Sequence, residues 1–259
     1  MKTIVCIKQV PSTNEVRLDP VTSTIIRDGR LSVTNPYDTF SIELAIQIKE
    51  KLGGEVIGLS MGIPETERLL RDAMSRGVDR SILLSDRAFA GADTLATAYT
   101  LSLGVKTIGA YNLILCGKMA IDGDTGQIGP ELAEYLKIPH VTDVKEVLEV
   151  NEERVICKKI TDKGHQILEV KLPALLTLLK DINLPRLPSI LGIRQSLDAP
   201  FVLKRAEEVR ADTSKIGLIG SPTQVLKTYV PKNSSEAIEL KGSQTKVVNA
   251  IKDIIGEVN

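Results

Sequence analysis

The chain has 259 residues, of which 42% are hydrophobic and 25% are charged, so its composition is that of an ordinary folded protein. Its 33 basic and 33 acidic residues give no net charge, which argues against a nucleic-acid-binding surface or a polybasic membrane patch. The longest apolar stretches are strand-sized and interrupted by Lys, Asp or Gly, so no transmembrane helix and no membrane insertion is expected.

The cysteines and histidines argue against metal or nucleophilic catalysis. Cys6, Cys116 and Cys157 are odd in number and widely spaced, which indicates free thiols in a reducing compartment, so we expect a cytoplasmic protein. His140 and His165 lie near neither each other nor a cysteine, so no metal site is expected. No G-x-S-x-G elbow and no Cys–His spacing is present, so no catalytic residue is assigned.

The first part of the chain alternates between strand and helix patterns. Residues 3–10 are β-branched and apolar and predict a strand that ends before Pro11. Residues 17–30 hold a short apolar run between Asp-Pro and Asp-Gly turn signals, which predicts a hairpin. An apolar helical period then begins at Asp38, a candidate N-cap, and ends at Gly53-Gly54. Further strands are predicted at 55–62, 81–86 and 111–118, and further helices from Pro64 to about Gly77 and over 91–109.

This alternation predicts an α/β fold, with a parallel sheet covered by helices on both faces. The segment 141–179 is rich in strand patterns and predicts an antiparallel extension that finishes on another core strand. Residues 198–240 are punctuated by prolines and show no clear period. An amphipathic helix follows, with an apolar face made of Val247, Val248, Ile251, Ile254 and Ile255. Such a face either clamps onto a second protein or packs back on the sheet.

The stretch "CGKMAIDGDTGQIGPELAEYL", residues 116–136, lies where a strand leads into a helix. In a parallel sheet this is the edge at which ligands bind. Glycines allow close approach of the backbone, N–H groups at a helix start attract phosphate, and the Thr125 hydroxyl can donate to the same anion. The spacing matches neither a Rossmann fingerprint nor a Walker loop. A structural turn with Asp caps is the alternative interpretation.

Two other turns could contribute to the same site. Asn35 and Asp38 in "NPYD" could face a ligand or form an Asx turn and a helix cap. Asp93 in "GADT" begins a helix, and a plain N-cap is the favoured interpretation. Cys6 and Cys116 lie in apolar strands and are expected in the core rather than as reactive thiols.

Together, "VCIKQVP", "NPYD", "GKMAIDGDTGQIGPELAEYL", "VKLPALLTL" and "LPRLPSILGI" resemble the beta subunit of electron transfer flavoproteins over nearly the whole chain. The resemblance implies a nucleotide-binding fold similar to adenine nucleotide alpha hydrolases, and an FAD-bearing alpha subunit as partner. Conventional members hold a structural AMP. Bifurcating members hold a second FAD that takes hydride from NADH and sends electrons to ferredoxin or flavodoxin and, through the alpha-subunit FAD, to a flavin dehydrogenase.

The resemblance also implies the residues of the cofactor site. They are Cys6, Asn35, Asp38, Met61, Asp93, Thr94, Gly117, Ala120, Asp122, Gly123, Asp124, Thr125, Gly126, Gln127 and Ile128, with 123–127 against the phosphates. The run Asp122-Gly123-Asp124-Thr125, followed by Pro-Glu-Leu-Ala, is similar to bifurcating members. FAD is therefore the expected cofactor, with AMP as the alternative in the same pocket.

The tip "LPRLPSILGIRQ" resembles the family's partner-recognition loop, with Pro188, Ile190, Leu191 and Arg194 as the implied contact residues. Leu187 replaces a frequent aromatic residue, so both an acyl-CoA dehydrogenase and a hydroxy-acid dehydrogenase remain open as partners. The implied segments are a nucleotide-binding core with its extension at 1–183, the recognition loop at 184–197, and an arm contacting the alpha subunit at 198–259. An ATP-binding or hydrolysing α/β protein is the rival from another class.

Overall fold

The computed structural model describes residues 1–12, 32–226 and 239–256. The chain divides into two compact units, Met1–Val225 and Leu226–Asn259, and each is described by itself. The hairpin predicted at 17–30 lies outside the described residues.

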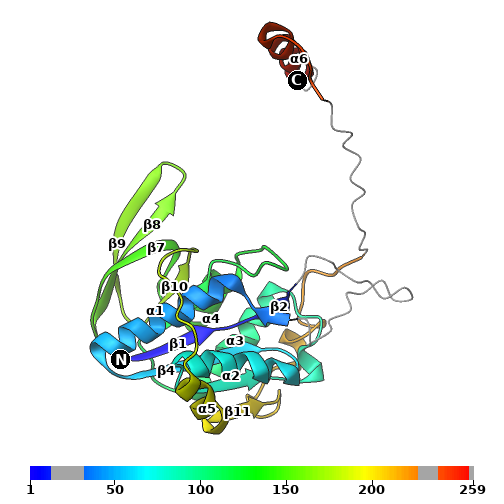
Figure 1. The fold of residues 1–259 in the computed structure, drawn as a ribbon. Helices are drawn as coiled ribbons and strands as arrows, with labels where there is room; N and C mark the ends of the chain where they lie inside the picture. The colour runs from blue at the N-terminus through cyan, green and yellow to red at the C-terminus, as the bar shows by residue number, and fades with distance from the viewer. Residues whose placement is uncertain (13–31, 227–238, 257–259) are drawn as a thin grey trace. The chain divides into compact units, whose positions relative to one another are not determined.

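A nine-stranded mixed sheet forms the centre of the first unit (Figure 1). Its parallel part consists, in spatial order, of β11 (Phe201–Lys204), β5 (Arg80–Leu84), β4 (Glu55–Met61), β1 (Lys2–Cys6), β6 (Leu113–Gly117), β10 (Ala174–Leu178) and β7 (His140–Val150). Two antiparallel strands, β8 (Arg154–Thr161) and β9 (Gly164–Lys171), complete it. The predicted α/β class with an antiparallel extension is therefore confirmed.

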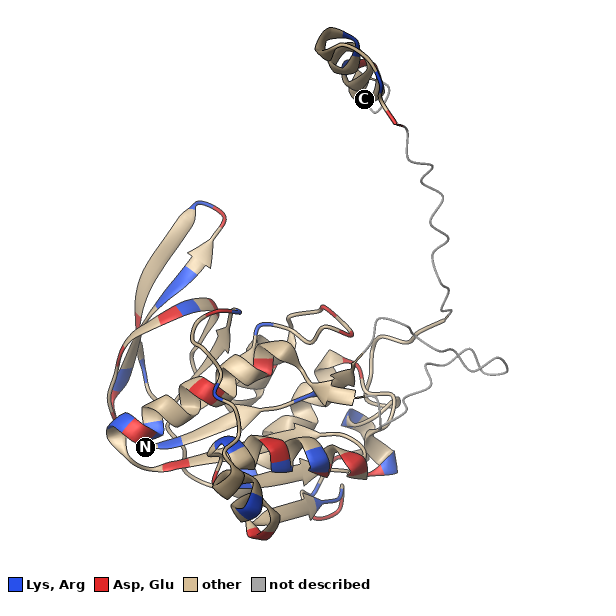
Figure 2. Ribbon diagram, viewed as in Figure 1, with Lys and Arg blue, Asp and Glu red and all other residues tan. Residues whose placement is uncertain are grey.

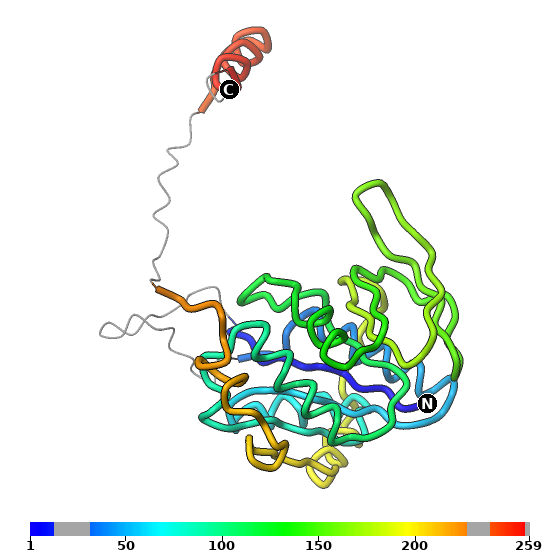
Figure 3. Tube along the Cα trace, turned by 180° about the vertical axis from the view of Figure 1, so that it is seen from behind, coloured from blue at the N-terminus to red at the C-terminus, as the bar shows by residue number. Residues whose placement is uncertain are grey.

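Helices cover both faces of the parallel strands (Figures 1 and 3). Each face has its own apolar core. One face carries α1 (Pro36–Leu52) and α2 (Glu67–Arg76), which packs against α5 (Ile190–Asp198). The other carries α3 (Thr94–Ile108) and α4 (Ile128–Leu136), which pack against each other. The strands of a parallel sheet are normally buried on both faces. A ligand can therefore approach this sheet at the ends of its strands.

The strand predicted over 3–10 is two strands in the structure. β1 ends at Cys6, and β2 (Gln9–Pro11) pairs with β3 (Ser32–Thr34) in a separate antiparallel ladder. The break has a clear cause, because the Lys8 backbone N–H donates to a side-chain oxygen of Asp38 at 2.8 Å and not to a neighbouring strand. The chain therefore leaves the sheet where the candidate site begins.

The antiparallel extension begins from a long strand. β7 pairs in parallel with β10 at its start and antiparallel with β8 further along, and the β8–β9 hairpin extends away from the parallel part (Figure 1). The predicted final core strand of segment 141–179 is β10, which follows β9 after Pro173 and lies between β6 and β7.

Several short elements were not visible in the sequence pattern. Residues 184–197, expected as a loop, contain most of α5, and β11 adds an edge strand next to β5. Val209 and Ile216 are buried in the core that also holds α3. The remaining short elements are the 3-10 turns η2 (Pro64–Thr66), η3 (Arg87–Phe89) and η4 (Thr213–Lys215). The stretch up to Val225 thus belongs to the first unit.

The second unit contains the predicted amphipathic helix as α6 (Gln244–Gly256). Val248, Ile251, Ile254 and Ile255 on it are exposed within the described residues. An apolar helix face of this kind normally lies against another surface.

Charged residues of both signs are interspersed along α1 and α2 (Figure 2). Among the described residues, no helix is both long enough and apolar enough to cross a lipid bilayer.

Candidate functional site

A cavity of about 320 Å³ opens at the carboxyl ends of the central parallel strands. From β1 the sheet continues to β4 on one side and to β6 on the other, which makes this the topological switch point where α/β proteins bind ligands. Its walls are formed by Cys6, Ile7, Lys8, Asn35, Asp38, Leu59, Met61, Ala92, Asp93, Thr94, Thr97, Leu101, Cys116, Gly117, Lys118, Met119, Ala120, Gly123, Thr125, Gly126, Gln127, Ile128 and Gly129. The volume lies at the lower end of the usual range for small-molecule sites.

Two glycines let the loop between β6 and α4 fold close to the sheet. A Cβ atom on Gly117 would lie 2.4 Å from Asp38 Oδ1, so no larger residue fits between β6 and α1 without a shift. Gly126 has φ +64°, a left-handed conformation that glycine adopts without strain. These two glycines shape the turn that is predicted from the sequence between β6 and α4.

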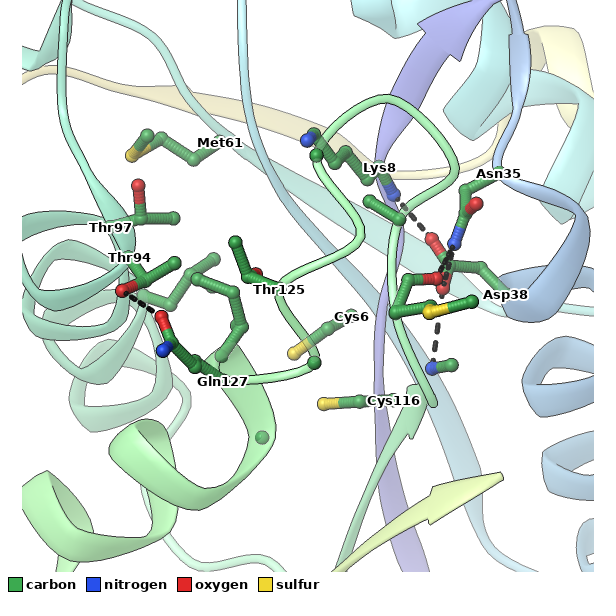
Figure 4. A pocket seen from close by; sticks show the side chains of 18 of the residues that line it. Cys6, Lys8, Asn35, Asp38, Met61, Thr94, Thr97, Cys116, Thr125 and Gln127 are labelled. Carbon is green, nitrogen blue, oxygen red and sulfur yellow. Dashed lines mark hydrogen bonds between the residues drawn. The ribbon is translucent and has the colours of Figure 1, made fainter. Parts of the chain in front are cut away.

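Asn35 and Asp38 hold the loop and the strand ends together, and both side chains are buried (Figure 4). Asp38 accepts the backbone N–H groups of Lys8 at 2.8 Å and Gly117 at 3.2 Å, and the Asn35 amide at 3.0 Å. The Asn35 amide also donates to the Met119 carbonyl at 2.9 Å, and its oxygen accepts the Ile121 N–H at 3.3 Å. The prediction of Asp38 as an N-cap was wrong, because Asn35 precedes α1 and the Asp38 carboxylate is used for these tertiary contacts.

Burial raises the pKa of Asp38 to about 7, although the hydrogen bonds from Lys8, Asn35 and Gly117 act in the opposite direction. All three donors favour the ionised carboxylate. The group therefore changes its charge near neutral pH.

Asp93 is the N-cap of α3, as predicted: its carboxylate accepts the Ala96 N–H at 3.1 Å. It also accepts the backbone N–H of Thr223 at 3.0 Å and the Thr223 hydroxyl at 2.6 Å. Burial acts to raise the pKa of Asp93, but these hydrogen bonds outweigh it and hold the pKa below its usual value. The segment before Val225 is thereby fastened next to the cavity.

The start of α4 offers backbone donors to the cavity. The first N–H groups of a helix have no partner within it, and the residues that carry them here, Ile128 and Gly129, line the cavity. Pro130 follows and has no N–H to contribute. A phosphate is the chemistry that such a helix start favours.

Thr94, at the start of α3, faces Gln127, at the start of α4 (Figure 4). The Thr94 Oγ1 atom lies 3.0 Å from Gln127 Oε1 and 3.1 Å from Glu131 Oε1. Thr97, one turn further along α3, also lines the cavity. These side chains form a polar wall opposite Lys8, Asn35 and Asp38 (Figure 4).

Two lysines line the cavity, and each is paired with a carboxylate. Lys8 Nζ lies 2.6 Å from Asp122 Oδ1, and Lys118 Nζ lies 2.8 Å from Asp143 Oδ1. The hydrogen bond to Asp143 raises the pKa of Lys118, so this side chain carries its positive charge at neutral pH. Both residues line the cavity, so each contributes positive charge near it.

Cys6 and Cys116 lie at the ends of the neighbouring strands β1 and β6 and are buried at the cavity wall (Figure 4). Their mutual hydrogen bond and their burial raise the pKa of Cys116 well above its usual value. A protonated, buried thiol is a poor nucleophile, which agrees with their expected place in the core.

The structure brings together nearly all of the predicted cofactor residues. Of the set, only Asp122 and Asp124 are absent from the cavity wall; Asp122 instead pairs with Lys8. Sequence reasoning missed Lys8, Thr97 and Lys118. Lys118 could have been predicted, because it is adjacent to the Gly-rich turn in the sequence. No neighbouring sequence pattern marks Lys8 or Thr97 as a cavity residue.

The predicted recognition residues lie at the exposed start of α5. The exposed fraction is 90% for Ile190 and 63% for Leu191, and Arg194 is also exposed, whereas Pro188 is half-buried. Ser189 caps the helix by accepting the Gly192 N–H at 2.9 Å. Nearby, Leu184 and Leu187 are 87% and 85% exposed.

Arg186 fastens this exposed tip to α1. Its guanidinium lies 2.9 Å from Glu43 Oε2 and 2.5 Å from Glu50 Oε1. Burial acts to raise the pKa of Glu43, but the hydrogen bonds from Arg186 lower it overall. The apolar side chains are thus presented from an anchored segment.

No cluster of three metal-ligating side chains occurs among residues 1–12, 32–226 and 239–256.

Comparisons with known proteins converge on one family. A family model described as the electron transfer flavoprotein domain matches residues 22–207. An electron transfer flavoprotein subunit beta of Thermoanaerobacterium thermosaccharolyticum is 45% identical, covering 100% of this chain and 98% of that protein. The caffeyl-CoA reductase-Etf complex subunit CarD of Acetobacterium woodii is 43% identical, over 89% and 88% of the two chains. Protein FixA of Bradyrhizobium diazoefficiens is 40% identical, over 98% and 91%.

Proposed function

Because this chain belongs to the electron transfer flavoprotein family, as a beta subunit, we propose that its cavity binds FAD in a bifurcating complex. In that complex NADH is the electron donor, and electrons pass to ferredoxin or flavodoxin and, through the FAD of an alpha subunit, to a flavin dehydrogenase. When bound, FAD supplies the redox chemistry, and the protein contributes position and electrostatics.

The cavity residues fit the phosphate-bearing half of this cofactor. The helix-start N–H groups of Ile128 and Gly129 and the hydroxyl of Thr125 provide donors, and Lys8 and Lys118 provide positive charge. With a volume of about 320 Å³, the cavity suits one nucleotide moiety. The isoalloxazine would extend beyond its mouth.

The observation that carries the FAD assignment is the polar wall made of Thr94, Thr97 and Gln127. These groups face the cavity from the side opposite Lys8 and Asp38, in addition to the helix start that binds a phosphate (Figure 4). A diphosphate and a ribityl chain present more oxygen atoms than a single phosphate, so they use donors on both sides. On this wall the donors to the ligand are the Thr97 hydroxyl and the Gln127 amide nitrogen, because the Thr94 hydroxyl proton is used within the wall. The Acetobacterium woodii relative is named as a subunit of a caffeyl-CoA reductase-Etf complex, which supports the assignment to a bifurcating complex.

AMP is the second candidate ligand, and it is favoured by the volume of the cavity, which suits one nucleotide moiety. A conventional beta subunit would hold AMP without electron transfer through this site. Measurement of FAD and AMP bound to the purified complex separates the two. A cavity that binds neither nucleotide would argue against both.

We place the alpha subunit against the arm that ends in α6, because Val248, Ile251, Ile254 and Ile255 are exposed on one helix. We place the dehydrogenase at Ile190, Leu191 and Arg194, on the tip fastened by Arg186. The relative named as a subunit of the caffeyl-CoA reductase-Etf complex of Acetobacterium woodii favours a partner dehydrogenase that acts on an acyl-CoA. A hydroxy-acid dehydrogenase is the alternative partner. The three buried free cysteines fit a reducing cytoplasm.

A further inference from the structure

Glu131 lies directly behind the polar wall of the cavity. It is in the first turns of α4, and α4 packs against α3, which begins at Thr94. Thr94 and Gln127 line the cavity, whereas Glu131 does not. The Glu131 side chain contacts the cavity wall at the Thr94 hydroxyl, at 3.1 Å.

The proton count at Thr94 restricts how these three groups bond. The Thr94 hydroxyl has one proton, and two acceptor oxygens lie near it, Gln127 Oε1 at 3.0 Å and Glu131 Oε1 at 3.1 Å. If Thr94 donates to Gln127, the contact with Glu131 is a hydrogen bond only when Glu131 itself carries a proton. The chain of donors then runs from Glu131 through Thr94 to Gln127.

The surroundings of Glu131 favour the protonated acid. Its Oε2 atom is buried and has no hydrogen-bond partner among the described residues. A buried carboxylate oxygen without a donor is costly, whereas the carbonyl oxygen of a neutral acid is tolerated better. Burial raises the pKa of Glu131, and the negative charge of Asp93 raises it further, while the Thr94 hydrogen bond opposes them.

We propose that Glu131 is a positioning residue that, through Thr94, turns the amide nitrogen of Gln127 into the cavity to bind a phosphate of the nucleotide. Figure 4 shows the Gln127 oxygen directed at Thr94 and its nitrogen on the other side of the amide. This nitrogen adds to the donors at the start of α4. The inference rests on the proposed nucleotide site and assigns a role to a residue outside it.

The orientation depends on pH through Glu131. As pH rises and Glu131 loses its proton, Thr94 must donate to the carboxylate, and Gln127 turns its oxygen toward the phosphate. Nucleotide affinity therefore falls with rising pH. Other ionisable groups also act on this region. Asp93, Lys215, and Tyr99 and Tyr135, whose rings pack 5.5 Å apart, lie on the same side, with Lys215 5.8 Å from the Tyr99 ring. On the opposite wall of the cavity, Asp38 has a pKa of about 7.

The test uses the complex with the alpha subunit, with the alpha-subunit FAD already bound. FAD is titrated into wild type, Glu131→Gln, Glu131→Ala and Gln127→Ala at a series of pH values from about 5 to about 9, and flavin fluorescence is followed. The side-chain amide introduced by Glu131→Gln can donate to Thr94 at every pH, so this variant is the matched control. FAD is suited to the test because its diphosphate keeps its charge over this range.

At low pH we expect Glu131→Gln to bind like wild type, and Glu131→Ala and Gln127→Ala to bind about tenfold more weakly, as for loss of a hydrogen bond to a charged group. At high pH wild type should lose a similar factor relative to Glu131→Gln, because the ionisation of Asp38 lowers the affinity of both proteins alike. The inference alone is overturned if Glu131→Ala binds FAD like wild type at low pH. It is also overturned if the ratio of wild-type to Glu131→Gln affinity is the same at low and high pH. A wild-type complex that binds no FAD in this cavity overturns the proposed function and the inference with it.

Discussion

Asp38 Oδ1 accepts the backbone N–H of Gly117 at 3.2 Å, and this contact ties the first turn of α1 to the end of β6. The other oxygen of Asp38 accepts the Lys8 N–H at the end of β1. Because β1 and β6 flank the topological switch point, one carboxylate fixes both strand ends at the cavity.

Asp38 should therefore give stability a specific pH dependence. Burial raises its folded-state pKa from 3.8 to about 7, so the folded state binds more protons than the unfolded state between these values. Stability from this group is present below about pH 4 and is lost as pH rises toward about 7, by on the order of 4 kcal/mol. Chemical unfolding across this range should show the slope in wild type and not in Asp38→Asn. Identical slopes for the two proteins would contradict this account of Asp38.

Thr125 should contribute directly to nucleotide affinity. Thr125→Val removes the hydroxyl and keeps the shape, so FAD affinity should fall about tenfold if the hydroxyl donates to a phosphate. Asp124→Asn is the control, because Asp124 is adjacent in sequence but does not line the cavity. Calorimetric titration of both variants checks the difference. Equal affinities would remove Thr125 from the site.

The loop glycines should differ in what they tolerate. A Cβ at Gly117 would lie 2.4 Å from Asp38 Oδ1, so Gly117→Ala should lose about 1–3 kcal/mol of stability. No atom lies within 4 Å of a Cβ at Gly123, so Gly123→Ala should fold like wild type. Thermal unfolding of the two variants is the measurement. Similar midpoints would show that the β6–α1 contact is looser than the structure indicates.

Ile190 should matter for partner binding and not for folding. Ile190 is 90% exposed, so Ile190→Asp should change stability by less than about 0.5 kcal/mol. Electron transfer to the dehydrogenase should nevertheless fall sharply, because a charge would enter an apolar contact. Ile167→Asp, at a 61% exposed position on β9, is the matched control and should leave transfer unchanged. Equal transfer rates for both variants would exclude the tip of α5 as the docking point.

The sequence was sufficient to predict the parallel sheet and the glycine-rich loop at the cavity, because both have local sequence patterns. Buried strands read as short β-branched runs, and Gly126 and its neighbours mark a turn at a strand end. Asp93 was correctly placed as an N-cap because capping depends on adjacent residues.

Structural features that depend on contacts between residues far apart in the sequence could not be predicted from local sequence patterns. Asp38 resembles an N-cap in sequence, but its partners Lys8 and Gly117 are 30 and 79 residues away. The short strand β11 exists because β5 offers an open edge, which no local pattern reveals. Thr97 reaches the cavity only because α3 begins at the same edge as α4.

The most direct test of the proposed function is the nucleotide content of the complex purified with its alpha subunit. Denaturation of that complex releases every bound nucleotide, and FAD and AMP can then be quantified separately. We predict about two FAD per complex and no AMP, because this cavity and the alpha subunit would each hold one flavin. About one FAD together with one AMP would contradict the bifurcating assignment and make this chain a conventional, AMP-binding beta subunit.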